Sequence, residues 1–168
     1  MGGTKLLAYE VNNGLTPVYD CAGLYGPTCS KGGTVDAGAP LPEWRHKARL
    51  TYATPYDLSL SVQWRYVGSV MAETLSNFQS LAAPTTYDPG REIDAYNYFD
   101  FSAAYVFQDS YTVRLGVNNL FDKQPPYVTS GGGGGANLCT TGPCNGNTYP
   151  ATYDALGRYL YANVTLEF

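Results

Sequence analysis

Tyr153-Asp-Ala-Leu-Gly-Arg-Tyr-Leu-Tyr-Ala-Asn-Val-Thr-Leu-Glu-Phe168 is the stretch of sequence that decides the fold. From residue 160 onward every second residue is apolar: Leu160, Ala162, Val164, Leu166 and Phe168. A period of two residues is typical of a β-strand with one apolar face. A strand that runs to the last residue needs a hydrogen-bonded partner along its whole length. Closure of a sheet into a barrel meets that need, because it leaves no free edge.

Four upstream segments alternate in the same way, and residues 4–11 are interpreted as the tail of a further strand. The segments are residues 44–52, 58–66, 99–107 and 111–118. Their apolar faces are Trp44, Ala48, Leu50 and Tyr52; Leu58, Leu60, Val62, Trp64 and Tyr66; Phe99, Phe101, Ala103, Tyr105 and Phe107; and Tyr111, Val113, Leu115 and Val117. The sequence therefore predicts an all-β protein of about five or six antiparallel strands.

The connections between these strands alternate between long and short. Residues 12–43, 68–93 and 122–157 are predicted to be long loops, and residues 54–57 and 108–110 to be tight turns. Short turns on one side and long loops on the other are typical of a transmembrane β-barrel. A soluble barrel shows the same alternation with its faces reversed. The loop asymmetry, the 16 tyrosines and the terminal Phe168 favour the membrane barrel.

Composition narrows the classes of function. The net charge of −4 argues against a nucleic-acid partner, because binding to phosphates requires clustered Lys and Arg. The sequence has no apolar run of 18 residues, so it predicts no transmembrane helix. The apolar run near Met1 is too short for a signal peptide.

The four cysteines lie in two of the predicted loops. Proximity favours the pairs Cys21–Cys29 and Cys139–Cys144 as disulfides formed in an oxidising compartment. A zinc site is the weaker alternative, because the spacing is not Cys-x-x-Cys and the one histidine, His46, falls in a strand. No metal or cofactor is expected.

No catalytic site is predicted. Five consecutive glycines, 131–135, lack the flanking strand and lysine of a phosphate-binding loop. The sequon Asn163-Val-Thr165 falls inside a strand and is read as a chance match. A single histidine supports no Ser/His/Asp set. The charged strand residues are interpreted as the water-facing wall of a polar interior; they are Arg45, Lys47, Arg49, Arg65, Arg114 and Glu167.

Several of these segments resemble the C-terminal barrel strands of TonB-dependent outer-membrane receptors. The most specific are Leu115-Gly-Val-Asn-Asn-Leu-Phe-Asp122 and residues 153–168. Three others are Trp44-Arg-His-Lys-Ala-Arg-Leu-Thr-Tyr52, Trp64-Arg-Tyr-Val-Gly-Ser69 and Tyr98-Phe-Asp-Phe-Ser102. The resemblance covers residues 44–122 and 153–168, in the family's order and spacing.

The resemblance implies a barrel of about 22 strands around an N-terminal plug, in the outer membrane of a Gram-negative bacterium. Residues 1–168 would be the C-terminal part of that barrel, with the plug domain absent. The implied function is uptake of a scarce nutrient of the siderophore, vitamin or glycan class, not enzymatic catalysis. The implied partners are outer-membrane lipid, the rest of the barrel and plug, the TonB complex acting through the plug, and the barrel-insertion machinery.

The resemblance also implies that the last strand carries an assembly signal for that machinery, presented on one face by Leu160, Val164, Leu166 and Phe168. Two alternatives remain open at this point. One is a small, complete outer-membrane barrel with a structural or adhesion role, and the other is a soluble ligand-binding β-barrel with an apolar interior.

Overall fold

The computed structural model describes residues 1–26, 28–29, 39–79, 81, 92–108, 110–128 and 148–166. Cys139, Cys144, Glu167, Phe168 and the five-glycine run lie outside the described residues. Within the described part, the one helical segment is a single 3-10 turn, η1 (Glu73–Leu75), and no helix is long and apolar enough to cross a membrane.

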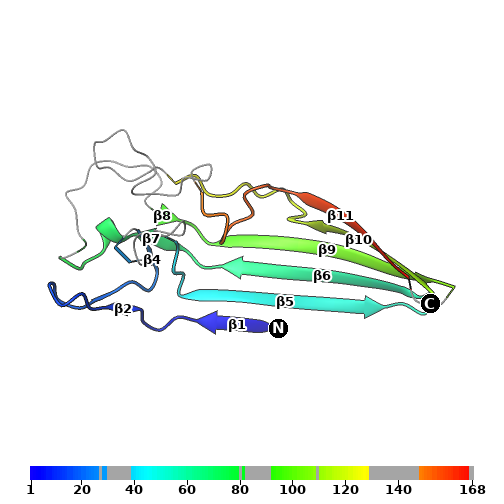
Figure 1. The fold of residues 1–168 in the computed structure, drawn as a ribbon, viewed down its shortest axis with the longest axis horizontal. Helices are drawn as coiled ribbons and strands as arrows, with labels where there is room; N and C mark the ends of the chain where they lie inside the picture. The colour runs from blue at the N-terminus through cyan, green and yellow to red at the C-terminus, as the bar shows by residue number, and fades with distance from the viewer. Residues whose placement is uncertain are drawn as a thin grey trace.

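A six-stranded antiparallel sheet dominates the fold (Figure 1). The order is β1-β5-β6-β9-β10-β11, and every neighbouring pair is antiparallel. The strands are β1 (Gly2–Lys5), β5 (Trp44–Ala53), β6 (Leu58–Val67), β9 (Tyr96–Phe107), β10 (Tyr111–Asn118) and β11 (Tyr159–Leu166). The predicted all-β class, antiparallel pairing and strand number are confirmed. The sheet is open in this chain, with β1 at one edge and β11 at the other.

The strand register separates an apolar face from a polar face. In one row across the sheet, Leu50 pairs with Val62, and Val62 pairs with Phe101. In the next row, Thr51 pairs with Ser61, and Ser61 with Ser102. The first row lies on what we call the apolar face and the second on the polar face. Leu50 is 75% exposed and Leu160 is 73% exposed, so among the described residues these parts of the apolar face have no cover.

Aromatic rings occupy both ends of the apolar face. At the long-loop end, His46 stacks on Tyr66 and Trp64 stacks on Phe99. At the short-turn end, Phe107 contacts Tyr111. Phe99 and Phe107 are eight residues apart on β9, which is about 26 Å along a strand, or roughly 20 Å once the strand tilts by about 40°. Aromatic rings thus lie at both ends of an apolar band, within which β9 also carries Phe101 and Tyr105.

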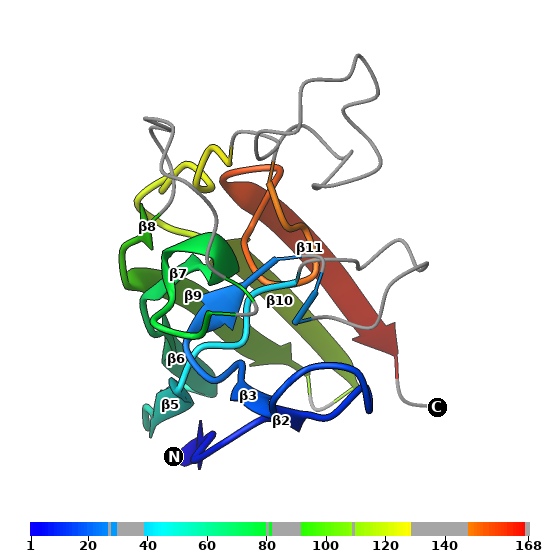
Figure 2. The same ribbon diagram turned by 90° about the vertical axis from the view of Figure 1, so that its left-hand side faces the viewer.

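Short strands at the long-loop end correct three of the sequence expectations. β2 (Glu10–Val11) pairs with β3 (Tyr19–Asp20), and β4 (Leu24–Tyr25), β7 (Val70–Ala72) and β8 (Glu92–Ile93) form a second small sheet (Figure 2). The loops predicted at 12–43 and 68–93 therefore contain regular structure, and the strand predicted over 4–11 is divided into β1 and β2. Elements of two or three residues give no local periodicity, because their hydrogen bonds join segments that are distant in sequence.

The first loop is closed by a disulfide between Cys21 and Cys29, as predicted, with a Cα–Cα distance of 5.5 Å. Both cysteines are fully buried beside Tyr19, Leu24 and Leu81. The Glu73 carboxylate accepts hydrogen bonds from the backbone N–H groups of Thr28 and Cys29, the latter at 2.8 Å. One buried carboxylate thus joins the disulfide loop to η1.

Candidate functional site

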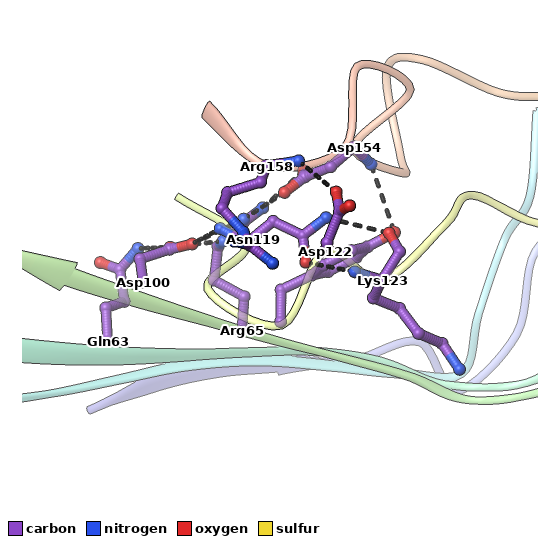
Figure 3. A network of polar contacts seen from close by, with 9 residues as sticks. Gln63, Arg65, Asp100, Asn119, Asp122, Lys123, Asp154 and Arg158 are labelled. Atoms are coloured by element: carbon purple, nitrogen blue, oxygen red, sulfur yellow. Dashed lines mark hydrogen bonds and ion pairs between the residues drawn. The ribbon is translucent and has the colours of Figure 1, made fainter. Parts of the chain in front are cut away.

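The polar face carries a network of charged side chains centred on Arg65 of β6 (Figure 3). Arg65 Nε and Nη2 donate to the two carboxylate oxygens of Asp100 on β9, at 2.7 and 2.9 Å. Its Nη1 donates to Asp154 at 2.9 Å, and its Nη2 also bonds to the second Asp154 oxygen. The guanidinium also lies over the ring of Tyr98, 4.9 Å from the centroid. One cation therefore joins two carboxylates that are 54 residues apart in the sequence.

Asp100 is the most deeply buried carboxylate of this network, at 8% exposure. Besides Arg65 it accepts hydrogen bonds from Gln63 Nε2 at 3.0 Å and from the backbone N–H of Asn119 at 2.9 Å. A buried carboxylate is tolerated when donors satisfy its oxygens and a cation offsets its charge. Asp100 meets both conditions, and it connects β6 to the chain that leaves β10.

The segment Leu115–Asp122 covers the end of β10 and the start of the loop that follows it. Two of its polar side chains form hydrogen bonds that hold the start of this loop. Asn119, at φ 52°, uses its side-chain amide both to donate to the carbonyl of Lys123 and to accept from the N–H of Lys123. Asp122, at φ 53°, accepts from the backbone N–H of Arg158 at 2.8 Å. The Asn119 and Asp122 contacts therefore close the base of the loop that leads to β11.

Gly116 in the same segment has a different role. Its partner across the sheet is Tyr161 of β11, and a Cβ atom at position 116 would overlap the Tyr161 ring. Any side chain at position 116 would force the Tyr161 ring out of this position.

Residues 148–158, which we call the strap, lie on the polar face at the long-loop end. Tyr153 packs against Tyr96, and Tyr149 packs against Tyr25. The backbone N–H of Asp154 donates to the Tyr98 hydroxyl at 3.3 Å. Burial raises the pKa of both Tyr149 and Tyr153 above that of an ordinary tyrosine. The strap is thus held by a tyrosine cluster and by the Arg65–Asp154 ion pair.

This arrangement is suited to holding and positioning groups, and no nucleophile–base pair lies within it. Among the described residues no three His, Cys, Asp or Glu side chains gather into a metal site. Arg45, Lys47, Arg49, Arg65 and Arg114 alternate with the apolar residues of their strands and share the polar face, as the sequence predicts. On β11, Leu160, Val164 and Leu166 share the apolar face. Their role as an assembly signal stays a prediction.

Arg65 was predicted from the sequence to face the polar interior, whereas Asp100, Asn119 and Asp154 were quoted within segments that resemble the family and were given no role of their own. Asp100 offers one signal in the sequence, because it is a lone carboxylate in a strand that otherwise alternates aromatic and small residues. Asp154 offers none, because its partner is 89 residues away.

An antiparallel sheet with one exposed apolar face, with aromatic rings at both of its ends, and one polar face is typical of the wall of a transmembrane β-barrel. A model of the family described as TonB dependent receptor-like, beta-barrel, matches residues 8–120. The chain belongs to this family of TonB-dependent receptor β-barrels.

Solved structures similar to this chain include ferric enterobactin receptors of Pseudomonas aeruginosa. A mutant receptor is 20% identical, with a TM-score of 0.49, and the match covers 78% of this chain and 17% of the receptor. A second mutant, in complex with enterobactin, is 19% identical, with a TM-score of 0.49, and the match covers 76% and 17% of the two chains. The chain thus spans about a sixth of the length of these receptors. No curated protein matches its sequence.

Proposed function

We propose that this chain forms the C-terminal part of the barrel wall of an outer-membrane TonB-dependent receptor, and that other residues of that receptor supply the plug. The observation that carries the proposal is the division of the main sheet into two faces. An apolar band with aromatic rings at both ends suits contact with lipid, and a polar face suits a water-filled interior. Family membership supports the same assignment.

The soluble-barrel alternative requires the apolar face to be enclosed. In this chain the strap and its tyrosines pack on the polar face, while Leu50, Leu115 and Leu160 on the apolar face stay exposed. Because the strap packs on the polar face, it cannot shield the apolar face from water. The apolar face therefore needs an apolar environment outside this chain. This distribution favours lipid as the partner of the apolar face.

The proposed orientation follows from the two ends of the sheet. The long-loop end, with its disulfide, faces the outside of the cell, and the turns at 54–57 and 108–110 face the periplasm. Nutrient uptake would use the plug and the TonB complex, and the nutrient is of the siderophore, vitamin or glycan class. The pair Cys139–Cys144 is proposed as a second disulfide on the outer side.

An uptake measurement tests this function. We expect deletion of the gene for the whole receptor to abolish high-affinity uptake of one labelled nutrient from these three classes: ferric siderophores, cobalamin or oligosaccharides. The gene restored in a strain without TonB should fail to rescue that uptake. Unchanged uptake of all three classes, together with recovery of the protein outside the outer-membrane fraction, would contradict the proposal.

The last strand is proposed to be read by the barrel-insertion machinery before the barrel closes. Deleting Phe168 from the receptor should then reduce the amount that reaches the outer membrane several-fold. The molecules that do arrive should melt close to the wild-type temperature, because one lost ring removes only about 2–3 kcal/mol of apolar burial from a closed hydrogen-bonded ladder. Immunoblots of membrane fractions and melting curves measure the two effects. Normal yield with a much lower melting temperature would show that Phe168 acts in stability, not assembly.

A further inference from the structure

A cavity of about 530 Å³ lies between the polar face and the strap. Arg45 and Lys47 of β5, Arg65 of β6 and Tyr98 of β9 line it from the sheet. Thr152 and Asp154 line it from the strap. A volume of this size is in the range of small-molecule sites.

The cations that line the cavity differ in whether they have ion-pair partners. Arg65 has two carboxylate partners, Asp100 and Asp154. Among the described residues the structure contains these two ion pairs, and neither of them involves Arg45 or Lys47. Lys47 also lies directly opposite Arg65 in the sheet register, where two like charges repel. Arg45 and Lys47 therefore face the cavity without an ion-pair partner, and the lining carries three cations, Arg45, Lys47 and Arg65, against one anion, Asp154.

The sheet and the strap supply further groups beside these cations. The β1 partner of Lys47 is Gly2, which has no side chain to compete for the same space. The buried Tyr98 holds the strap in place, because its hydroxyl accepts a hydrogen bond from Asp154 N–H. The Thr152 hydroxyl on the strap is a further donor at the opposite side of the cavity.

The type and the number of the cations indicate the chemistry of the ligand. Arg45 and Lys47 are two residues apart on one face of a strand, so their Cα atoms are about 6.6 Å apart and their side chains line the same cavity. A small molecule with two or more carboxylates can offer one carboxylate to each of them. Arg45 can hold its carboxylate with two parallel N–H bonds, whereas Lys47 acts as a point charge.

We propose that this cavity binds a small polycarboxylate, held by Arg45 and Lys47 and covered by the strap. The proposal rests on the proposed function, since it requires the polar face to be the interior wall of the receptor. The strap covers one side of the cavity, which favours a diffusible small molecule over a folded acidic domain as its occupant. The Arg65 ion pairs position the strap and do not themselves contact the ligand.

Titration calorimetry on the purified receptor tests the proposal. The probe is propane-1,2,3-tricarboxylate at low ionic strength, and acetate is the monovalent comparison. We expect measurable binding of the tricarboxylate, at least tenfold weaker binding of acetate, and weakening of both in 0.5 M salt. Arg45→Gln and Lys47→Gln should each raise the Kd for the tricarboxylate at least tenfold, and the double variant should show no binding heat.

The matched control is Arg114→Gln, because Arg114 is also a cation on the polar face but does not line this cavity. It should leave the Kd unchanged. An equal loss with Arg114→Gln, or no effect of the double variant, would overturn the site. So would a wild-type receptor that binds no tricarboxylate, or a carbodiimide cross-link from Lys47 to another part of the receptor, which would assign the cations to a protein carboxylate.

The outer-membrane location and the folded, detergent-resistant state of each variant are checked first. A receptor that is folded in the outer membrane and binds no tricarboxylate refutes the cavity alone. A chain that is not in the outer membrane refutes the proposed function.

Discussion

Replacing Arg65 with methionine is expected to lower the free energy of unfolding of the receptor by about 3 kcal/mol. The Asp100 and Asp154 side chains are 10% and 24% exposed, and both depend on Arg65 for their counter-charge. Removing one partner of a buried ion pair leaves the other charge desolvated and unmatched, which costs more than the pair itself contributes. The loss should appear in denaturant unfolding of the receptor in lipid vesicles.

Two companion variants separate this cause from a simple loss of charge. Arg114→Met removes a cation from the same face with no ion-pair partner among the described residues, and should change stability by less than about 0.5 kcal/mol. Adding Asp100→Asn and Asp154→Asn to Arg65→Met should restore part of the lost stability, because the stranded charges are gone. If the triple variant were less stable than Arg65→Met, the network would act through packing and not through charge.

The main sheet could be predicted from sequence because its signal is local. On β6 the alternation of Leu58, Leu60 and Val62 with Ser59 and Ser61 defines both a strand and its two faces within five residues. The same signal gave β5, β9, β10 and β11 to within a few residues. Two-residue strands such as β4 and β8 carry no such pattern, since they exist only through pairing with β7.

The Arg65 network could not be predicted from the sequence, for a different physical reason. Ion-pair partners are chosen by the fold, and Arg65, Asp100 and Asp154 come from two strands and a loop. The sequence placed Arg65 on a water-facing wall, which is correct for its side of the sheet but hides its partners. The segment Leu115–Asp122 resembles a family motif, but the roles of its residues depend on the strand register and on positive φ angles. Gly116 lies beneath the Tyr161 ring, and the Asn119 and Asp122 side chains hold the start of the loop.

Leu60→Arg is expected to have the other large effect, a loss of about 2–4 kcal/mol in lipid. Leu60 pairs with Ala103, which lies midway between Phe99 and Phe107 on β9. An arginine there would place its charge near the centre of the bilayer, where no water solvates it. Ser61→Arg is the control, because Ser61 is the adjacent residue on the polar face, beside Thr51 and Ser102. It keeps the same added charge in contact with water.

The difference in unfolding free energy between Leu60→Arg and Ser61→Arg, measured on the receptor refolded into lipid vesicles, shows which face of the sheet meets the membrane. Leu60→Arg is expected to be less stable than Ser61→Arg by at least about 2 kcal/mol, because only position 60 faces lipid. Equal losses at the two positions, or a larger loss at Ser61, would contradict the assignment of the apolar face to the membrane.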